Sequence, residues 1–113
     1  MDCIFCKIIK GEIPSEKVYE DDLVCAFKDI NPAAPVHIII IPKQHFSSIL
    51  ELKDEDVDKI IPHIHKVAIK LAEKFEIKDK GFRLVTNCGD AAGQTVKHLH
   101  FHLIGGKTLA WVY

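Results

Sequence analysis

Hydrophobic residues recur at three- and four-residue spacing between positions 54 and 76, as on one face of an amphipathic helix. Asp54 stands where an N-cap belongs, and acidic residues fill the first turn that follows. We therefore predict a long helix from Asp54 to about Glu76. The residues of its apolar face are Val57, Ile60, Ile61, Ile64, Val67, Ala68, Leu71, Ala72 and Phe75.

Strand patterns occupy much of the remaining chain. Residues 17–30 predict two short strands around an acidic turn. Residues 36–42, VHIIIIP, predict a buried strand that packs against apolar side chains on both faces. Residues 80–87 and 96–104 predict two more strands, separated by a glycine-containing loop. The chain therefore predicts five strands in total.

A short helix is predicted at residues 3–12, where Asp2 can act as the N-cap. Its apolar stripe comprises Ile4, Phe5, Ile8 and Ile9. These elements predict one α+β domain over residues 1–113. We expect a five-stranded antiparallel meander sheet with one long and one short helix, both on one side of the sheet.

Composition and charge exclude several classes of protein. The formal net charge is −1, from 15 basic and 16 acidic residues, which is unlike a general nucleic-acid binder. The strongest apolar run is far too short to span a bilayer, and an acid stands where a signal peptide needs basic residues. We expect a cytoplasmic protein with no nucleic-acid or membrane partner, whose four cysteines are not disulfides.

Three of the seven histidines stand at alternate positions in HLHFHLI: His98, His100 and His102. Side chains alternate between the faces of a strand, so the three imidazoles share one face. Successive histidines are roughly 6.6 Å apart along a strand, and we expect them to line a groove without touching one another.

The segment GDAAGQT, just before these histidines, offers small residues whose backbone amides can approach an anion. Gln94 and Thr95 add side-chain donors. Phosphate beside histidines favours phosphoryl or nucleotidyl transfer with a histidine nucleophile. The spacing alone leaves open which histidine attacks.

HLHFHLI resembles the signature of the histidine triad (HIT) family, and the similarity extends over nearly the whole chain. Residues 3–45 resemble the N-terminal half of the family, and residues 86–106, TNCGDAAGQTVKHLHFHLIGG, its active-site half. The Gly-Gly pair followed by Trp111 is similar to the Hint branch. The Fhit branch, which cleaves diadenosine polyphosphates, shares GQTVKH but usually departs after the triad.

The resemblance implies a mechanism and a set of site residues. His100 would attack the α-phosphorus of a nucleoside 5′-phosphoryl compound, forming a nucleotidyl-histidine that water hydrolyses. His102 would contact phosphate oxygens or the leaving side. Asn87, Gln94 and Thr95 would bind phosphate, with Thr95 also assisting the departing group. Asp29 would hold the ribose hydroxyls, and the base pocket would be Phe5, Ile8, Phe27 and Ile30, for which core packing is the competing interpretation.

Cys3 and Cys6 stand at the Cys-x-x-Cys spacing of half a zinc site. Similarity to zinc-binding bacterial HIT proteins supplies the other half, His45 and His98. Four protein ligands would close the site, so the Zn²⁺ would be structural and not needed for the chemistry. The alternative is a redox pair, for which no thioredoxin-like βαβ context is present.

The leading hypothesis is therefore a hydrolase of purine nucleoside 5′-phosphoramidates or aminoacyl-adenylates that releases AMP. The alternatives are a dinucleoside polyphosphate hydrolase, and a nucleotide-binding or zinc-scaffold protein with vestigial hydrolysis. The resemblance also implies a homodimer in which the two sheets join and the C-terminal tail approaches the active site of the other subunit.

Overall fold

The computed structural model describes residues 3–111, so Asp2, the predicted N-cap of the short helix, lies outside the described residues. The helices are α1 (Ile4–Ile9) and α2 (Asp54–Lys74), and two 3₁₀ turns are η1 (Ile49–Glu51) and η2 (Asp90–Ala92). The strands are β1 (Lys17–Glu20), β2 (Val24–Lys28), β3 (Val36–Pro42), β4 (Phe82–Val85) and β5 (Phe101–Gly105).

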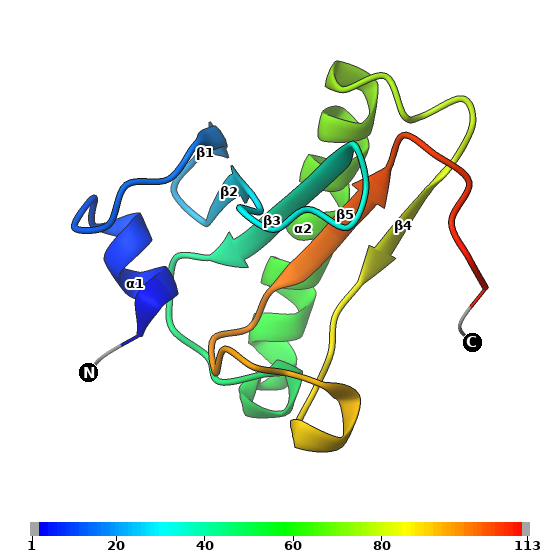
Figure 1. Ribbon diagram of the computed structural model, residues 1–113. Coiled ribbons are helices and arrows are strands. Elements are labelled where there is room, and N and C mark those ends of the chain that lie inside the picture. The colour runs from blue at the N-terminus through cyan, green and yellow to red at the C-terminus, as the bar shows by residue number, and fades with distance from the viewer. Residues whose placement is uncertain (1–2, 112–113) are drawn as a thin grey trace.

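The five strands form one antiparallel sheet, which confirms the predicted α+β class. Their order is β1-β2-β3-β5-β4, so β5 lies between β3 and β4 (Figure 1). The sheet therefore departs from a simple meander at one place. The long connection through α2 carries the chain past the position beside β3, and β5 later fills it.

The long helix begins one residue after Lys53, and the Asp56 carboxylate accepts a hydrogen bond from the Lys53 N–H. Asp54 is thus the first helical residue instead of the cap, and acidic residues occupy the first turn, where the helix dipole favours them. The helix ends at Lys74, two residues before the predicted end. Within residues 3–111, no helix combines the length and apolar character that a membrane span requires.

The two helices lie on opposite faces of the sheet, contrary to the expectation that both lie on one side. The larger core joins α2 to one face, where Ile38, Ile40 and Leu103 contribute. The smaller core joins α1 to the other face and consists of Phe5, Ile8, Cys25, Phe27, Ile39 and Ile41. Alternation along β3 supplies both cores, which confirms that this strand is apolar on both faces.

The last strand begins later than predicted. Pairing of β5 with β3 starts at Phe101, so His98 and His100 precede the strand. The backbone there bonds to loops instead: Leu99 N–H donates to the Phe46 carbonyl, and the Thr86 hydroxyl donates to the His100 carbonyl. The side chains still alternate, because Leu99, Phe101 and Leu103 all enter the core beside α2.

Candidate functional site

A pocket of about 320 Å³ opens on the sheet face that carries α1. Phe5, Ile8 and Phe27 are buried and form its apolar wall, while Ile30 is 89% exposed at its rim. The four predicted base-pocket residues therefore all line one cavity, and three of them also belong to the smaller core. The pocket is also lined by Asp29, Thr95, His100 and His102.

The hydrogen bonds of His100 fix which of its ring nitrogens can act as a nucleophile. Its Nδ1 lies 2.7 Å from the His98 carbonyl oxygen, which can only accept, so Nδ1 carries the hydrogen. In a neutral imidazole, Nε2 then bears the lone pair. Burial lowers the pKa of His100, against the smaller raising effects of this bond and of Asp29, and so favours the neutral ring.

His102 has the opposite tautomer, and a fourth histidine sets it. The Ala33 N–H donates to His37 Nδ1 over 2.9 Å, so the hydrogen of the neutral His37 ring is on Nε2. His37 Nε2 lies 2.9 Å from His102 Nδ1 and donates to it. His102 therefore presents Nε2–H as a donor. Burial first, then repulsion from His100 and His37, lowers the pKa of His102 to about 4.

The triad histidines are closer than the strand spacing predicted. The rings of His100 and His102 meet edge to face with centroids 5.0 Å apart, which is direct contact. The expectation that they do not touch was therefore wrong. The spacing along the backbone therefore does not set the separation of the two rings.

The sequence interpretation gave His37 no functional role, yet its buried ring links Asp29 to His102. The Asp29 Oδ2 lies 3.4 Å from His37 Nε2, and Asp29 Oδ1 accepts from the Asn31 N–H. Alternation along β3 did place His37 on the same face as Ile39. What the pattern could not show is that this face lies beside His102, since β5 is distant in sequence.

The predicted phosphate-binding residues divide into two groups. Thr95 is exposed and lines the pocket. Gln94 is buried, and its amide is committed to the loop: Oε1 accepts from the Gly89 N–H, and Nε2 donates to the Ser47 and Val96 carbonyls. Gln94 therefore shapes the loop, and phosphate contact by its side chain requires these bonds to break.

Asn87 is half-buried in the loop after β4 and is not among the residues that line the pocket. Its predicted contact with phosphate stays a prediction.

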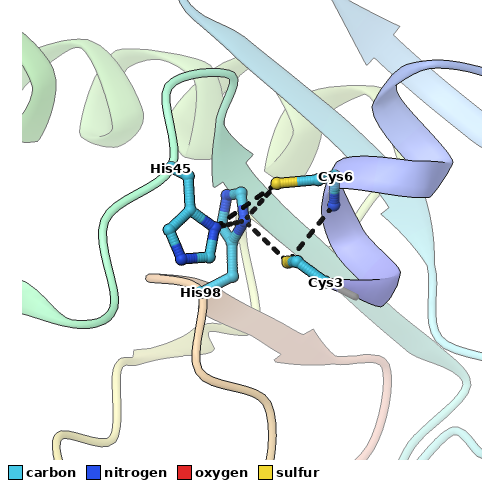
Figure 2. A group of neighbouring side chains, drawn as sticks. All are labelled: Cys3, Cys6, His45 and His98. Carbon is cyan, nitrogen blue, oxygen red and sulfur yellow. Dashed lines mark hydrogen bonds between the residues drawn. The ribbon is translucent and has the colours of Figure 1, made fainter. Parts of the chain in front are cut away.

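A second cluster brings Cys3, Cys6, His45 and His98 together, with their ligand atoms all within 4.8 Å of one another. Figure 2 shows the four side chains pointing toward one another from α1, from the loop after β3 and from the segment before β5. His98 Nε2 donates to the Pro42 carbonyl over 3.0 Å, which leaves the Nδ1 lone pair facing the cluster. This donor set fits a metal ion.

Four pairs of ligand atoms in this cluster lie 3.1 to 3.6 Å apart. His98 Nδ1 lies 3.3 Å from Cys3 Sγ and 3.1 Å from His45 Nδ1. Cys6 Sγ lies 3.3 Å from His45 Nδ1 and 3.6 Å from His98 Nδ1. Burial lowers the pKa of His98, so its ring is neutral and able to ligate.

His63 of α2 is half-buried and paired. Its Nε2 lies 2.6 Å from Asp21 Oδ2, which also accepts from the Tyr19 hydroxyl. Burial would raise the pKa of Asp21, but the bonds from Tyr19, Val24, His63 and Leu23 lower it well below its ordinary value. Cys25 is fully buried in the smaller core.

The sheet, the long helix and the alternating histidines beside a pocket define an α+β domain of the histidine triad class. A family model described as the HIT domain matches residues 10–109. The chain belongs to the HIT family, which confirms the resemblance.

Two relatives of known structure share the fold over nearly the whole length of both chains. A HIT family hydrolase from Clostridium thermocellum is 55% identical, with a TM-score of 0.94 over 98% of this chain and 96% of its own. A histidine triad protein from Clostridium difficile is 52% identical, with a TM-score of 0.95 over 100% and 97%. The purine nucleoside phosphoramidase of Escherichia coli is 44% identical over 108 residues, or 96% of this chain and 90% of that protein.

Proposed function

We propose that this protein is a hydrolase that cleaves purine nucleoside 5′-phosphoramidates, and related aminoacyl-adenylates, to the nucleoside monophosphate. The observation that carries the proposal is the pair of opposite tautomers in one pocket. His100 presents a lone pair, whereas His102 presents an N–H. A nucleophile and a hydrogen-bond donor side by side are what displacement at phosphorus needs. The relative from Escherichia coli named purine nucleoside phosphoramidase supports this substrate class.

In the first step, His100 Nε2 attacks the α-phosphorus, and the bond from phosphorus to the leaving nitrogen breaks. The leaving amine takes up a proton from water, while His102 Nε2–H and the Thr95 hydroxyl, which both line the pocket, donate hydrogen bonds to the reacting group. In the second step, water attacks the nucleotidyl-histidine. Its oxygen bonds to phosphorus, one of its protons returns to the solvent, and the monophosphate leaves with His100 restored. Asp29 lies beside the apolar wall, where ribose hydroxyls would be bound.

The test is AMP release from adenosine 5′-phosphoramidate by the wild type, His100→Ala and His65→Ala. His65 is an exposed residue of α2 and serves as the control. We expect release by the wild type and the control and none by His100→Ala. Release that survives His100→Ala moves the nucleophile to another residue. Much faster turnover of a dinucleoside polyphosphate in a parallel assay contradicts the proposed substrate class.

We propose that the second cluster holds one structural Zn²⁺ per chain. Zn–N bonds of about 2.0 Å and Zn–S bonds of about 2.3 Å give tetrahedral edges of about 3.3–3.8 Å. Four of the six separations between ligand atoms, 3.1 to 3.6 Å, are close to that size, and all six are within 4.8 Å. Bound there, the ion would join α1 to the segment before β5. Metal analysis should find one zinc per chain and a loss in Cys6→Ser, while an equal content in that variant contradicts the site.

We propose that the protein is a homodimer in which two sheets join at β4. That strand ends the sheet and carries the exposed Phe82 (Figure 1). The tail residues Lys107, Thr108 and Leu109 line one pocket together with Phe82 and Arg83 of β4. Pairing of such edges satisfies their open backbone groups. Sedimentation should show a dimer at micromolar concentration, weakened in Phe82→Lys. A wild-type monomer contradicts the proposal.

We propose further that residues 1–113 act as a single HIT domain in the cytoplasm. Cys3 and Cys6 can ligate metal only as thiolates, which a reducing compartment maintains. Localisation of the tagged chain by fractionation tests this.

A further inference from the structure

The pocket that holds His100 and the second cluster meet at one side chain, Phe5. The second cluster is called the metal cluster from here on. Phe5 lies between Cys3 and Cys6 in sequence, so two ligands of the metal cluster bracket it on α1. Its ring is buried and meets His100 edge to face, with centroids 5.1 Å apart. The same ring lies 5.9 Å from that of His98. Phe5 therefore contacts the nucleophile and a metal-cluster residue at once.

A second connection runs through the backbone. The His98 ring belongs to the metal cluster, while the carbonyl of the same residue receives the hydrogen bond from His100 Nδ1. The ring is also held by the Pro42 carbonyl. A shift of His98 would therefore move the acceptor that fixes the tautomer of His100.

The helix that carries Phe5 has little stability of its own. It spans only six residues, from Ile4 to Ile9, and helices shorter than about 12 residues are marginal in water. Its burial rests on Phe5 and Ile8. Thiolate ligation at Cys3 and Cys6 would fix both ends of the turn that holds the Phe5 ring in place.

We propose that the metal cluster positions the catalytic nucleophile, and that Phe5 and the His98 carbonyl transmit the effect. The ligand is a thiolate-binding divalent cation of the Zn²⁺ class. The kinetic part of this inference rests on the proposed function, whereas the structural part does not. Phe5 is a positioning residue: the metal holds α1, α1 holds Phe5, and Phe5 with the His98 carbonyl holds the His100 ring with Nε2 toward the pocket.

The first test measures the tautomer directly. Imidazole nitrogen NMR of His100, assigned by its absence in His100→Gln, is recorded for the zinc-loaded and the chelator-stripped protein. We expect a single Nδ1–H tautomer with zinc and a mixture of tautomers without it, while the sheet amide signals are retained. An unchanged His100 signal after stripping overturns the inference. If the stripped protein unfolds, zinc-loaded Phe5→Leu must show the mixture, and an unchanged ring there overturns it.

The second test is a thermodynamic cycle that combines zinc removal with the Phe5→Leu substitution. Stripping should lower the wild-type kcat on the order of 10- to 100-fold, since small misplacements of a reacting group cost that much. Phe5→Leu should lower kcat in the loaded enzyme and then lose little more on stripping. Ile30→Ala is the matched control, because Ile30 lines the same pocket but lies outside α1 and the metal cluster. It should lose as much on stripping as the wild type does.

The outcomes separate this inference from the proposed function. Absence of AMP release by the loaded wild type contradicts the function, while the NMR experiment still decides the positioning role. Normal release that stripping does not alter overturns the positioning role alone. Equal losses on stripping in Phe5→Leu and Ile30→Ala also overturn it, because Phe5 would then carry none of the effect.

Discussion

His98 and His100 stand two residues apart on the same side of one segment, yet their surroundings differ. His98 is 0% exposed, and both ring nitrogens are occupied by the Pro42 carbonyl and by the metal cluster. His100 is also buried against Phe5, but its second nitrogen faces an open pocket. His98 belongs to a cluster of four candidate metal ligands, whereas His100 keeps one ring nitrogen free toward the pocket.

The difference shows how a repeated residue acquires separate roles. The two rings have the same chemistry and the same pKa direction, since burial lowers the pKa of both. Their backbone acceptors decide which nitrogen keeps the lone pair: Nδ1 in His98 and Nε2 in His100. The first lone pair faces the sulfur atoms of Cys3 and Cys6, and the second faces the pocket where we propose that phosphate binds.

The sharpest test of this comparison replaces each of the two histidines by alanine in turn. His100→Ala should lower kcat/KM for AMP release by about 10³-fold or more and leave the zinc content unchanged. His98→Ala should lose zinc and about 3 kcal/mol of unfolding free energy, because a ligand is removed and the buried Pro42 carbonyl loses its donor. Metal analysis, kinetics and thermal unfolding of both variants measure this. Identical profiles for the two variants would contradict the separation of roles.

A smaller effect is expected at the residue that sets the tautomer of His102. His37→Leu removes the donor to His102 Nδ1 and leaves the Ala33 N–H without its acceptor. We expect kcat to fall about 10- to 100-fold, the usual cost of losing an orienting partner. His37→Gln, which can both donate and accept, should recover part of the rate. Failure of Gln to exceed Leu would show that His37 acts by packing alone.

The pH profile tests whether both pocket histidines are neutral. A ring with the ordinary pKa of 6.5 is about 90% protonated at pH 5.5. Since the pKa of His100 is lowered and that of His102 is about 4, kcat/KM of the zinc-loaded enzyme should hold well below pH 6.5. A profile that falls with a midpoint of 6.5 would contradict the assignment.

Stability should follow the same groups. Between pH 6.5 and about 4, the unfolded chain binds protons that the half-buried His102 ring does not. The stabilisation is therefore fully present above pH 6.5 and is lost as pH falls toward 4. Melting temperatures across this range, with zinc content checked at each pH, measure the loss.

The smallest effect concerns the pair formed by His63 and the Asp21 carboxylate. Asp21→Asn should cost about 1–2 kcal/mol of unfolding free energy, because Asp21 accepts from His63, Tyr19 and two backbone N–H groups. The pKa of Asp21 is lowered, so its contribution is present above pH 3.8 and lost below it. The exposed Asp22→Asn is the control, and equal effects of the two changes would contradict the role of the network.

Much of the architecture followed from local pattern. Period-3.6 spacing predicted α2 within two residues at its far end, and the β-branched run predicted β3 at its observed bounds. Both signals are strong because each residue's burial is set by the element's own geometry. The order of β4 and β5 and the face taken by α1 were predicted wrongly, since these depend on which distant segments pack together.

The sequence by itself determined the elements, the shared face of the triad and the residue types of both clusters. Only the tertiary structure decided that His37 lies against His102 and that the Gln94 amide is hydrogen-bonded to neighbouring loop backbone. It also decided that Phe5 lies between the metal cluster and the pocket. The physical reason is that sequence patterns report local structure, whereas these contacts join residues that are distant in sequence. Periodicity records which face of an element is buried, whereas the tautomer of a ring depends on single acceptors contributed by other parts of the chain.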